Sequence, residues 1–129
     1  MPATDYTANL IATAMAHGEP YQGPAEVDLA LVTTTPTPTT PGTEITLGSY
    51  ARVTYAQSGW TNDGAGSLTN PDVVAFPQAT ADYDAEVVAV EAYDDSGTRL
   101  WYIPLTTPQT VLSGQTPEWL PGDLVLQVA

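Results

Sequence analysis

The chain has 129 residues, the length of one domain, and it contains no cysteine. Disulfides, thiolate metal sites and cysteine nucleophiles are therefore excluded. Two arginines and no lysine stand against 15 carboxylates, a formal net charge of −13. That charge excludes nucleic-acid binding and attraction to an anionic membrane, because both depend on clustered cations.

The first predicted element is a helix over Asp5–His17, inside an N-terminal segment 1–18. Thr4 or Asp5 can accept hydrogen bonds from the free N–H groups of the first turn, and Gly18 is a natural helix stop. Tyr6, Leu10 and Ala14 recur at steps of four, and Ile11 and Met15 lie beside them, which gives an apolar stripe at helical spacing. A helix this short is marginal alone, so we expect its apolar stripe to pack against a partner surface.

A strand is predicted next, because Val27, Leu29 and Leu31 alternate with more polar residues. The segment 33–43 follows and contains TTTPTPTTPG. Repeated proline removes backbone donors and favours polyproline II, so we expect an extended, stiff, solvated loop. It serves either as a connector or as an arm that lies across a neighbouring subunit.

The remaining strands are predicted from short apolar or alternating runs. These runs are Tyr50–Tyr55, Val73–Phe76, Glu86–Tyr93, Thr98–Leu105, Thr110–Leu112 and Asp123–Val128. Between them, Ser58–Asn70 is expected to be a loop with a turn at 62–64, and residues 94–97 form the turn of a hairpin. The sequence therefore predicts a single mainly β domain over 1–129. We expect an antiparallel β-sandwich or open barrel of about seven short strands with one N-terminal helix.

Catalytic machinery is not indicated by the sequence. The only histidine, His17, lies at the predicted helix end, and no Gly-x-Ser-x-Gly nucleophile motif is present. Gly64-Ala65-Gly66 lacks the remaining features of a phosphate-binding loop. We therefore expect no enzymatic activity, no catalytic residues and no cofactor.

Carboxylates are the one abundant reactive group. Asp82, Asp84 and Glu86 alternate and would share one face of an extended chain, where they could hold Ca²⁺. Neither they nor the pair Asp94 and Asp95 match the spacing of an EF-hand loop. We expect solvated loop charge and no metal site, with calcium binding and a glycosidase-type carboxylate pair as alternatives.

Aromatic residues offer a second alternative. Trp60, Trp101 and Trp119 could form a sugar-stacking platform, and Trp60 is the best candidate for exposure because it lies beside a glycine-rich segment. A carbohydrate-binding module would expose Trp60 or Tyr50. Packing in the core or at a subunit interface is the competing interpretation.

Three runs together resemble a family of small virion proteins of tailed phages: PAEVDLALVTTTPTPTTPGTEITLGSYARV, VVAFPQATADYDAEVVAVEAYDD and LWYIPLTTPQTVLSGQTPEWLPGDLVLQV. The shared features are an F-P-x-A-T-A-D segment, a Leu-x-Tyr strand leading to Leu-Thr-Thr-Pro, and a terminal Gly-Asp-Leu strand. The likeness extends from about residue 5 to residue 128. It implies a tail-fibre, minor tail or head-decoration protein without catalytic residues.

From the resemblance and the composition we expect a capsid decoration (cement) protein, made in the host cytoplasm and bound to the outside of the shell as a homotrimer. A tail or tail-fibre component is the alternative, and a carbohydrate-binding module is a more remote one. Expected partners are further copies of the chain and the major capsid protein or tail proteins. The residues that we expect at an interface are Tyr6, Leu10, Trp60, Pro36 and Pro38.

Overall fold

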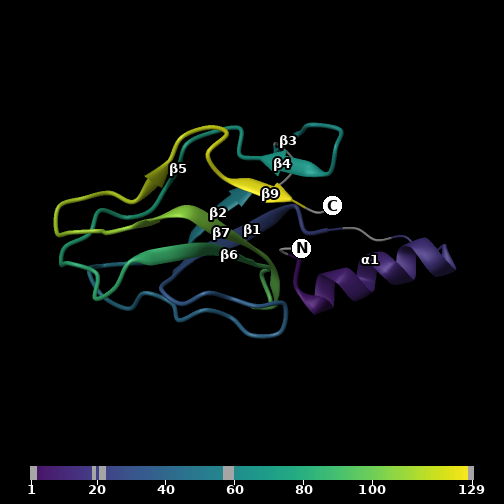
Figure 1. The fold of residues 1–129 in the computed structure, drawn as a ribbon, viewed down its shortest axis with the longest axis horizontal. Coiled ribbons are helices and arrows are strands. Elements are labelled where there is room, and N and C mark those ends of the chain that lie inside the picture. The colour runs from purple at the N-terminus through teal and green to yellow at the C-terminus, as the bar shows by residue number, and fades with distance from the viewer. Residues whose placement is uncertain (1–2, 19, 21–22, 57–59, 128–129) are drawn as a thin grey trace.

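The computed structural model describes residues 3–18, 20, 23–56 and 60–127. One helix, α1 (Asp5–His17), precedes the strands, and Figure 1 shows it projecting from one end of a β body. The strands in the described part of the chain are β1 (Glu26–Val32), β2 (Val53–Ala56), β3 (Thr61–Asn62), β4 (Ser67–Thr69), β5 (Val74–Ala75), β6 (Val87–Tyr93), β7 (Arg99–Gln109), β8 (Glu118–Trp119) and β9 (Val125–Gln127). Among these residues no helix has the length and apolarity needed to cross a bilayer.

The strands form three antiparallel sheets. The largest has four strands in the order β2-β1-β6-β7, and smaller sheets pair β3-β4-β9 and β5-β8. The sheets do not close into a barrel. The predicted mainly β, antiparallel fold with one N-terminal helix is therefore confirmed.

One connected apolar core joins the sheets. Its largest fully buried members include Leu29, Leu31 and Leu124. The first two lie on alternate residues of β1, as the sequence pattern predicted, and Val90 of β6 pairs with Leu31 in the neighbouring strand. The period-two alternation of β1 therefore selects the face of the four-stranded sheet that packs inward.

The opposite face of that sheet is also buried. Ala30 and Val32 of β1 have no exposed surface, and neither have their cross-strand partners Glu91 and Ala89 of β6. An antiparallel sheet at the edge of a small domain commonly leaves one face in water. Here the segment that follows β1 folds back and covers that face.

Helix α1 begins and ends where the sequence predicted. Thr4 is its N-cap, with Oγ1 accepting a 3.3 Å hydrogen bond from the N–H of Thr7. Gly18 ends the helix at φ +67°, a left-handed conformation that glycine adopts without steric cost. Exposed His17 lies in the last turn, where the helix dipole favours a cation. The β body does not cover the apolar stripe at its start, because 50% of Tyr6 is exposed to solvent.

The predicted strands differ from the observed ones in the second half of the chain. The expected strand Thr110–Leu112 is not a strand, whereas β7 continues past its predicted end at Leu105. The predicted loop over 58–70 contains β3 and β4, although the turn between them is where it was expected. Ser58 and Val128, which ended two of the predictions, lie outside the described residues.

Candidate functional site

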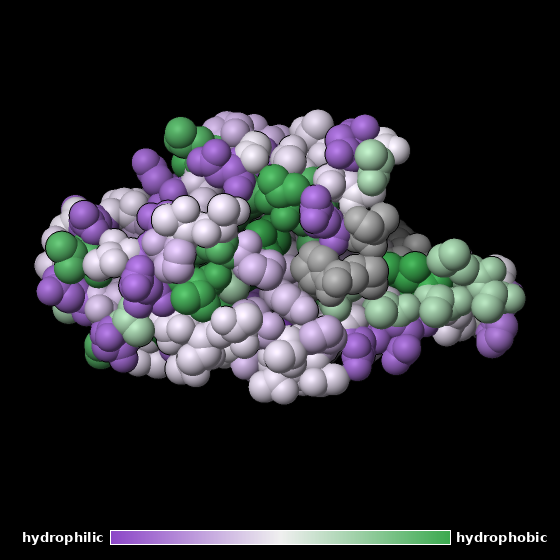
Figure 2. Space-filling view, in the orientation of Figure 1, coloured by the Kyte–Doolittle hydropathy of each residue, from purple (hydrophilic) through white to green (hydrophobic). Residues whose placement is uncertain are grey.

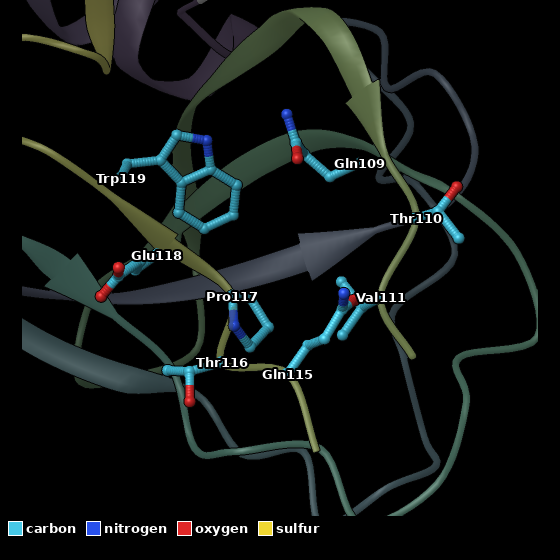
Figure 3. Close-up of a pocket in the computed structure, with 8 residues that line it drawn as sticks. All are labelled: Gln109, Thr110, Val111, Gln115, Thr116, Pro117, Glu118 and Trp119. Atoms are coloured by element: carbon cyan, nitrogen blue, oxygen red, sulfur yellow. The ribbon is translucent and has the colours of Figure 1, made fainter. Parts of the chain in front are cut away.

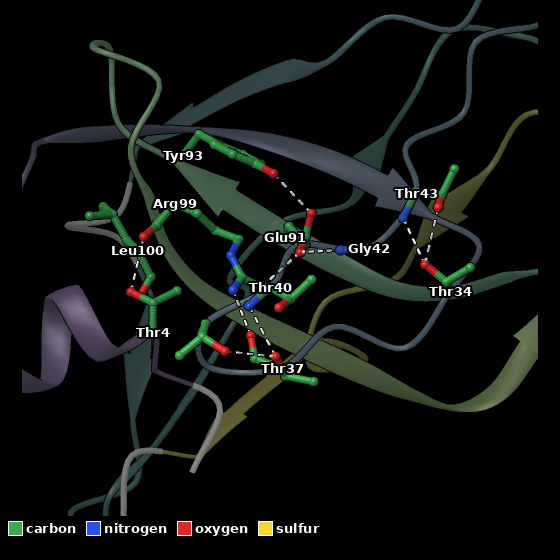
Figure 4. Close-up of polar contacts among 11 residues, drawn as sticks. Thr4, Thr34, Thr37, Thr40, Gly42, Thr43, Glu91, Tyr93, Arg99 and Leu100 are labelled. Carbon is green, nitrogen blue, oxygen red and sulfur yellow. Dashed lines mark hydrogen bonds and ion pairs between the residues drawn. The ribbon is translucent and has the colours of Figure 1, made fainter.

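The segment 33–43, predicted to be an extended and solvated loop, does not extend away from the body. It returns to the sheet, where the N–H of Thr33 donates to the carbonyl of Thr43 (2.8 Å). Within the loop, the N–H of Thr40 donates to Oγ1 of Thr37 (3.0 Å), and Pro36 is buried. Figure 4 shows these threonines gathered over the sheet. The loop is therefore a closed cover on the outer face of β1 and β6.

A buried carboxylate fastens this cover. The side chain of Glu91 is 1% exposed and pairs with Nη1 of Arg99 at 2.9 Å. It also accepts hydrogen bonds from the N–H of Gly42 (3.1 Å) and the hydroxyl of Tyr93 (3.0 Å), as Figure 4 shows. Arg99 in turn donates to the carbonyl of Thr37. One ion pair thus holds the loop at two points, and each charge in it has several partners.

The same charge affects Tyr93. Burial and the nearby Glu91 carboxylate raise the pKa of Tyr93 to about 12, because both disfavour a phenolate. The guanidinium of Arg52 lies over the face of the Tyr93 ring in a cation–π contact, with its Cζ 4.0 Å from the ring centroid. Tyr93 therefore links the two arginines of the chain.

A second ion pair closes the end of the loop. Arg52 donates from Nε and Nη2 to the two carboxylate oxygens of Glu44, at 2.9 and 2.8 Å. The hydroxyl of Tyr50 donates to Glu44 at 2.6 Å and accepts from the N–H of Leu31 at 3.0 Å. Burial raises the pKa of Glu44, but the hydrogen bonds from Arg52 and Tyr50 outweigh it and hold that pKa below its usual value.

Both cations of the chain are thus committed to the loop region. Glu91, Arg99 and Glu44 were not predicted as positioning residues. Two signals could have found them: a glutamate in the middle of an apolar strand needs a buried partner, and only two cations were available.

The base of helix α1 lies against this clamp. The N–H of Asp5 donates to the carbonyl of Pro38, and that of Thr4 donates to the carbonyl of Leu100 (both 3.1 Å). Oγ1 of Thr4 lies 2.9 Å from the carbonyl oxygen of Arg99. These contacts attach the first turn of the helix to both the loop and β7.

A shallow groove of about 460 Å³ lies between the helix base, the loop and the β6–β7 hairpin. Its lining includes Asp5, Tyr6, Pro38, Tyr93 and Arg99. The structure therefore brings together two of the residues that we expected at an interface, Tyr6 and Pro38. Both are exposed.

The other expected interface residues are placed differently. Leu10 is 36% exposed, one turn beyond Tyr6 on the same side of the helix. The burial of Pro36 removes it from any surface contact. Trp60 does not line this groove: it lines another hollow, with Tyr55 and Pro71, and packs edge-to-face on Trp101, with ring centroids 5.5 Å apart.

The aromatic residues do not form the exposed platform that a carbohydrate-binding module would need. Trp60 is half-buried, and Trp119 is buried against Phe76 with ring centroids 5.9 Å apart. Tyr50 stacks on the same phenylalanine, and its hydroxyl donates a hydrogen bond to Glu44. These rings pack in the core or at its edge, which is the competing interpretation.

The carboxylates that were considered as calcium ligands include two, Asp82 and Asp94, that accept backbone hydrogen bonds in loops. Oδ1 of Asp82 accepts from the N–H of Ser113 (2.7 Å), and bends at Asp84 and the next residue interrupt the extended chain that a shared face required. At the hairpin tip, Oδ1 of Asp94 accepts from the N–H of Thr98 (2.8 Å). Hydrogen bonds at this tip lower the pKa of Asp94. No group of three or more metal-ligating side chains occurs in the described part of the chain.

A second hollow lies where β7 ends and the chain approaches β8. This cleft of about 390 Å³ is lined by Gln109, Thr110, Val111, Gln115, Thr116, Pro117, Glu118 and Trp119. Figure 3 shows amide and hydroxyl groups around it. One carboxylate and no histidine line the cleft, so it lacks the paired acid and base of a hydrolase.

The structure thus shows a β body clamped by two ion pairs, with a helix that projects from one end. Comparison with known families gives the class of protein. The family model described as podophage GP4 fiber I protein gp80 matches residues 2–127, and the chain belongs to this family. No curated protein matches the chain.

Membership makes the chain a structural fibre protein of the phage virion, and not an enzyme. It confirms the resemblance to tailed-phage virion proteins that the sequence suggested. It also favours the tail-fibre alternative over the capsid decoration protein that the sequence analysis placed first.

Proposed function

We propose that this protein is a building block of the podophage tail fibre and that it resides on the tail, not on the capsid shell. The family match over residues 2–127 carries the proposal. Its work is mechanical: it presents a rigid body and a projecting helix to neighbouring fibre and tail proteins.

The clamped loop supports this role. A fibre subunit must keep its shape outside the cell without disulfides, since the chain has no cysteine. The two ion pairs, Glu91–Arg99 and Glu44–Arg52, fasten the longest proline-rich segment to the sheet. Both faces of the central strands are then packed, which limits the local opening of a small domain.

The homotrimer expected from the sequence stays a prediction. So does contact with the major capsid protein, for which no feature of the fold provides support. Association with other fibre or tail proteins is the partnership that the family supports.

Immunogold electron microscopy of intact virions tests the proposal. Antibodies against the purified chain are expected to label the tail fibres and to leave the capsid shell bare. The control is a phage whose gene for this chain is deleted, which should lose both the label and the fibre density. Gold distributed over the capsid, together with binding of the purified chain to undecorated capsids, would overturn the proposal and restore the decoration protein.

A further inference from the structure

We infer that the cleft between the end of β7 and β8 binds an uncharged, hydroxyl-rich ligand of the saccharide class. Such binding goes beyond the proposed function, because a mechanical building block of a fibre need not hold a small ligand. It is a property of the isolated chain, so it fails or holds independently of where the protein lies on the virion.

The cleft has an apolar floor and a polar rim. Three of its eight lining residues are buried and largely apolar: Val111, Pro117 and Trp119. The other five are exposed and carry amide, hydroxyl or carboxylate groups. Figure 2 shows the same mixture of hydrophilic and hydrophobic colours over the rest of the body, so composition alone does not mark the cleft. Its layered arrangement does, because a sugar ring likewise presents C–H groups on its faces and hydroxyls around its edge.

The polar groups of the rim are uncommitted. The hydroxyls of Thr110 and Thr116 and the carboxylate of Glu118 have no hydrogen-bond partner within the described part of the chain. The same holds for the indole N–H of Trp119, which Figure 3 shows on the side of the ring toward Gln109. The cleft therefore offers both donors and acceptors to a ligand whose hydroxyls can use either.

The walls of the cleft are held in place before a ligand arrives. The carbonyl of Gln115 accepts a hydrogen bond from the N–H of Ala79 (2.8 Å). The carbonyl of Pro117 accepts one from the N–H of Phe76 (2.9 Å). Oε1 of Gln115 accepts from the N–H of Leu112 (2.8 Å), so its amide is fixed with the NH₂ group left as donor. A preformed site avoids the entropic cost of ordering loops on binding.

Charge and polarity select the class of ligand. No cationic side chain lines the cleft, and the net charge of −13 repels phosphates and acidic sugars. A cationic ligand would meet a single carboxylate, Glu118, with no exposed aromatic face beside it, because only 7% of Trp119 is exposed. An apolar partner would leave the polar rim without hydrogen bonds. Sugar hydroxyls, in contrast, donate strong charge-assisted hydrogen bonds to a carboxylate.

The size and place of the cleft suit a short saccharide. Its volume of about 390 Å³ is near the lower end of the roughly 300–1,000 Å³ of small-molecule sites. Single-site binding is therefore expected to be weak, and many copies on one particle would strengthen it. Figure 1 shows the chain between β7 and β8 at the end of the body away from α1, so contacts through the helix leave the cleft open. This site also differs from the stacking platform at Trp60 or Tyr50 that the sequence suggested as an alternative.

A broad array of neutral and acidic glycans tests the ligand class. The chain contains no lysine, so its α-amino group is the one amine through which many copies can be coupled to a fluorescent particle. Binding to uncharged oligosaccharides is expected, without binding to uronic-acid or phosphorylated glycans. An array with no uncharged ligand, or with binding confined to charged glycans, would overturn the inference.

Nuclear magnetic resonance of the ¹⁵N-labelled full chain tests the place of binding. Titration with the uncharged array glycan that binds most strongly should shift the indole N–H signal of Trp119 and the side-chain amides of Gln109 and Gln115. Trigalacturonic acid is the charged control and should leave these signals unchanged. The affinity should not depend on NaCl concentration, because the ligand carries no charge. Shifts centred on Trp60, or an affinity that falls as salt rises, would contradict the proposed site.

Two variants that each remove one exposed carboxylate test the rim. Glu118→Ala should weaken binding of the same glycan about tenfold, because its charge-assisted hydrogen bonds are lost. Glu86→Ala is the matched control, since Glu86 is exposed and does not line the cleft, and it should keep the affinity of the wild type. Amide spectra of both variants check that the fold is unchanged. Equal affinities of the two variants would refute the role of Glu118 and, with it, the proposed rim.

Discussion

Helix α1 and the loop 33–43 lie beside one another on the β body, but the helix is held at one end and the loop along its length. Within the described part of the chain, hydrogen bonds of Thr4 and Asp5 attach the helix to the body, and the helix projects from there. The loop is fastened near both ends and at its middle, through Gly42, Thr33 and Thr37. A helix satisfies its backbone groups internally and can stand alone at one end, whereas a proline-rich loop must obtain its partners from the body.

The largest expected effect is on the loop clamp. Glu91→Ala should lower the free energy of unfolding by about 3–5 kcal/mol, because it leaves the guanidinium of Arg99 buried without its counter-charge. Urea unfolding followed by fluorescence measures the change. Glu86→Ala is the matched control, because Glu86 is an exposed glutamate directly before β6. It should change the free energy of unfolding by less than about 0.5 kcal/mol.

Replacing both partners sharpens this result. Glu91→Met combined with Arg99→Met should recover a large part of the loss, since no unpaired charge then remains. A single Glu91→Ala variant as stable as the wild type would mean that the ion pair does not hold the loop, and the contrast with the helix would disappear.

Gly42→Ala tests how closely the loop approaches the sheet. A Cβ atom at this position would lie 2.4 Å from the carbonyl oxygen of Thr34 and 2.7 Å from Cβ of Val32. The backbone would have to move, so we expect the free energy of unfolding to fall by about 1–3 kcal/mol, as measured by thermal or urea unfolding. Thr35→Ala, at an exposed position of the same loop, should have little effect. Equal losses from the two variants would argue against close packing.

Thr4→Ala tests the attachment of the helix. Loss of the cap should destabilise α1 by about 1 kcal/mol, because the N–H of Thr7 loses its acceptor. Amide hydrogen exchange should become faster in the helix and stay unchanged in β1 and β6. Thr4→Ser keeps the hydroxyl and should behave like the wild type. Faster exchange throughout the body would show that the helix is not an independent projection.

The smallest effect concerns pH and Glu44. Its pKa is lower in the folded chain than in the unfolded chain, so the folded state binds fewer protons there. The stabilisation is complete above the unfolded value of about 4.3 and is lost as pH falls through the lower, folded value. Glu44→Gln should therefore flatten the decline in stability below about pH 4, by at most about 1 kcal/mol for this partly exposed pair. Identical pH profiles for the variant and the wild type would contradict this assignment.

Elements with a long, regular pattern were predictable from the sequence. Helix α1 follows from its cap, its spacing and Gly18, and β1 follows from its alternation. The hairpin of β6 and β7 was equally clear, because Asp94 and Gly97 form a turn between two apolar runs. In each case the residues that favour the element locally also make the contacts that hold it in the folded chain.

Three short strands, β3, β4 and β8, were not predicted, because two or three residues carry no measurable alternation. They exist through their cross-strand partners, which lie elsewhere in the chain or across a turn. By contrast, β5 and β9 lie within two runs that were predicted as strands. Thr110–Leu112 had a strand-like composition, yet the N–H of Leu112 is taken by Oε1 of Gln115 and no strand pairs with it.

The candidate site was predictable only in part. Tyr6 and Leu10 are surface residues as expected, because the helical spacing fixes their side of α1. The position of the loop was not predictable from its own residues: it depends on Glu91 and Arg99, which are 49 or more residues away from Gly42. Composition predicted that the segment is not a strand, but it could not show what the segment would lie against.

The commitment of both arginines to internal ion pairs also bears on digestion by trypsin-like proteases, which cut after lysine and arginine. The chain offers them only Arg52 and Arg99, and Arg99 lies within β7 next to buried Leu100. A trypsin-like protease would have to wait for the strand to open before it could reach this bond. Arg52, by contrast, is exposed and lies before β2, so the first cut is expected there, and the rate of cleavage after Arg99 provides a direct clock for how often the sheet comes apart.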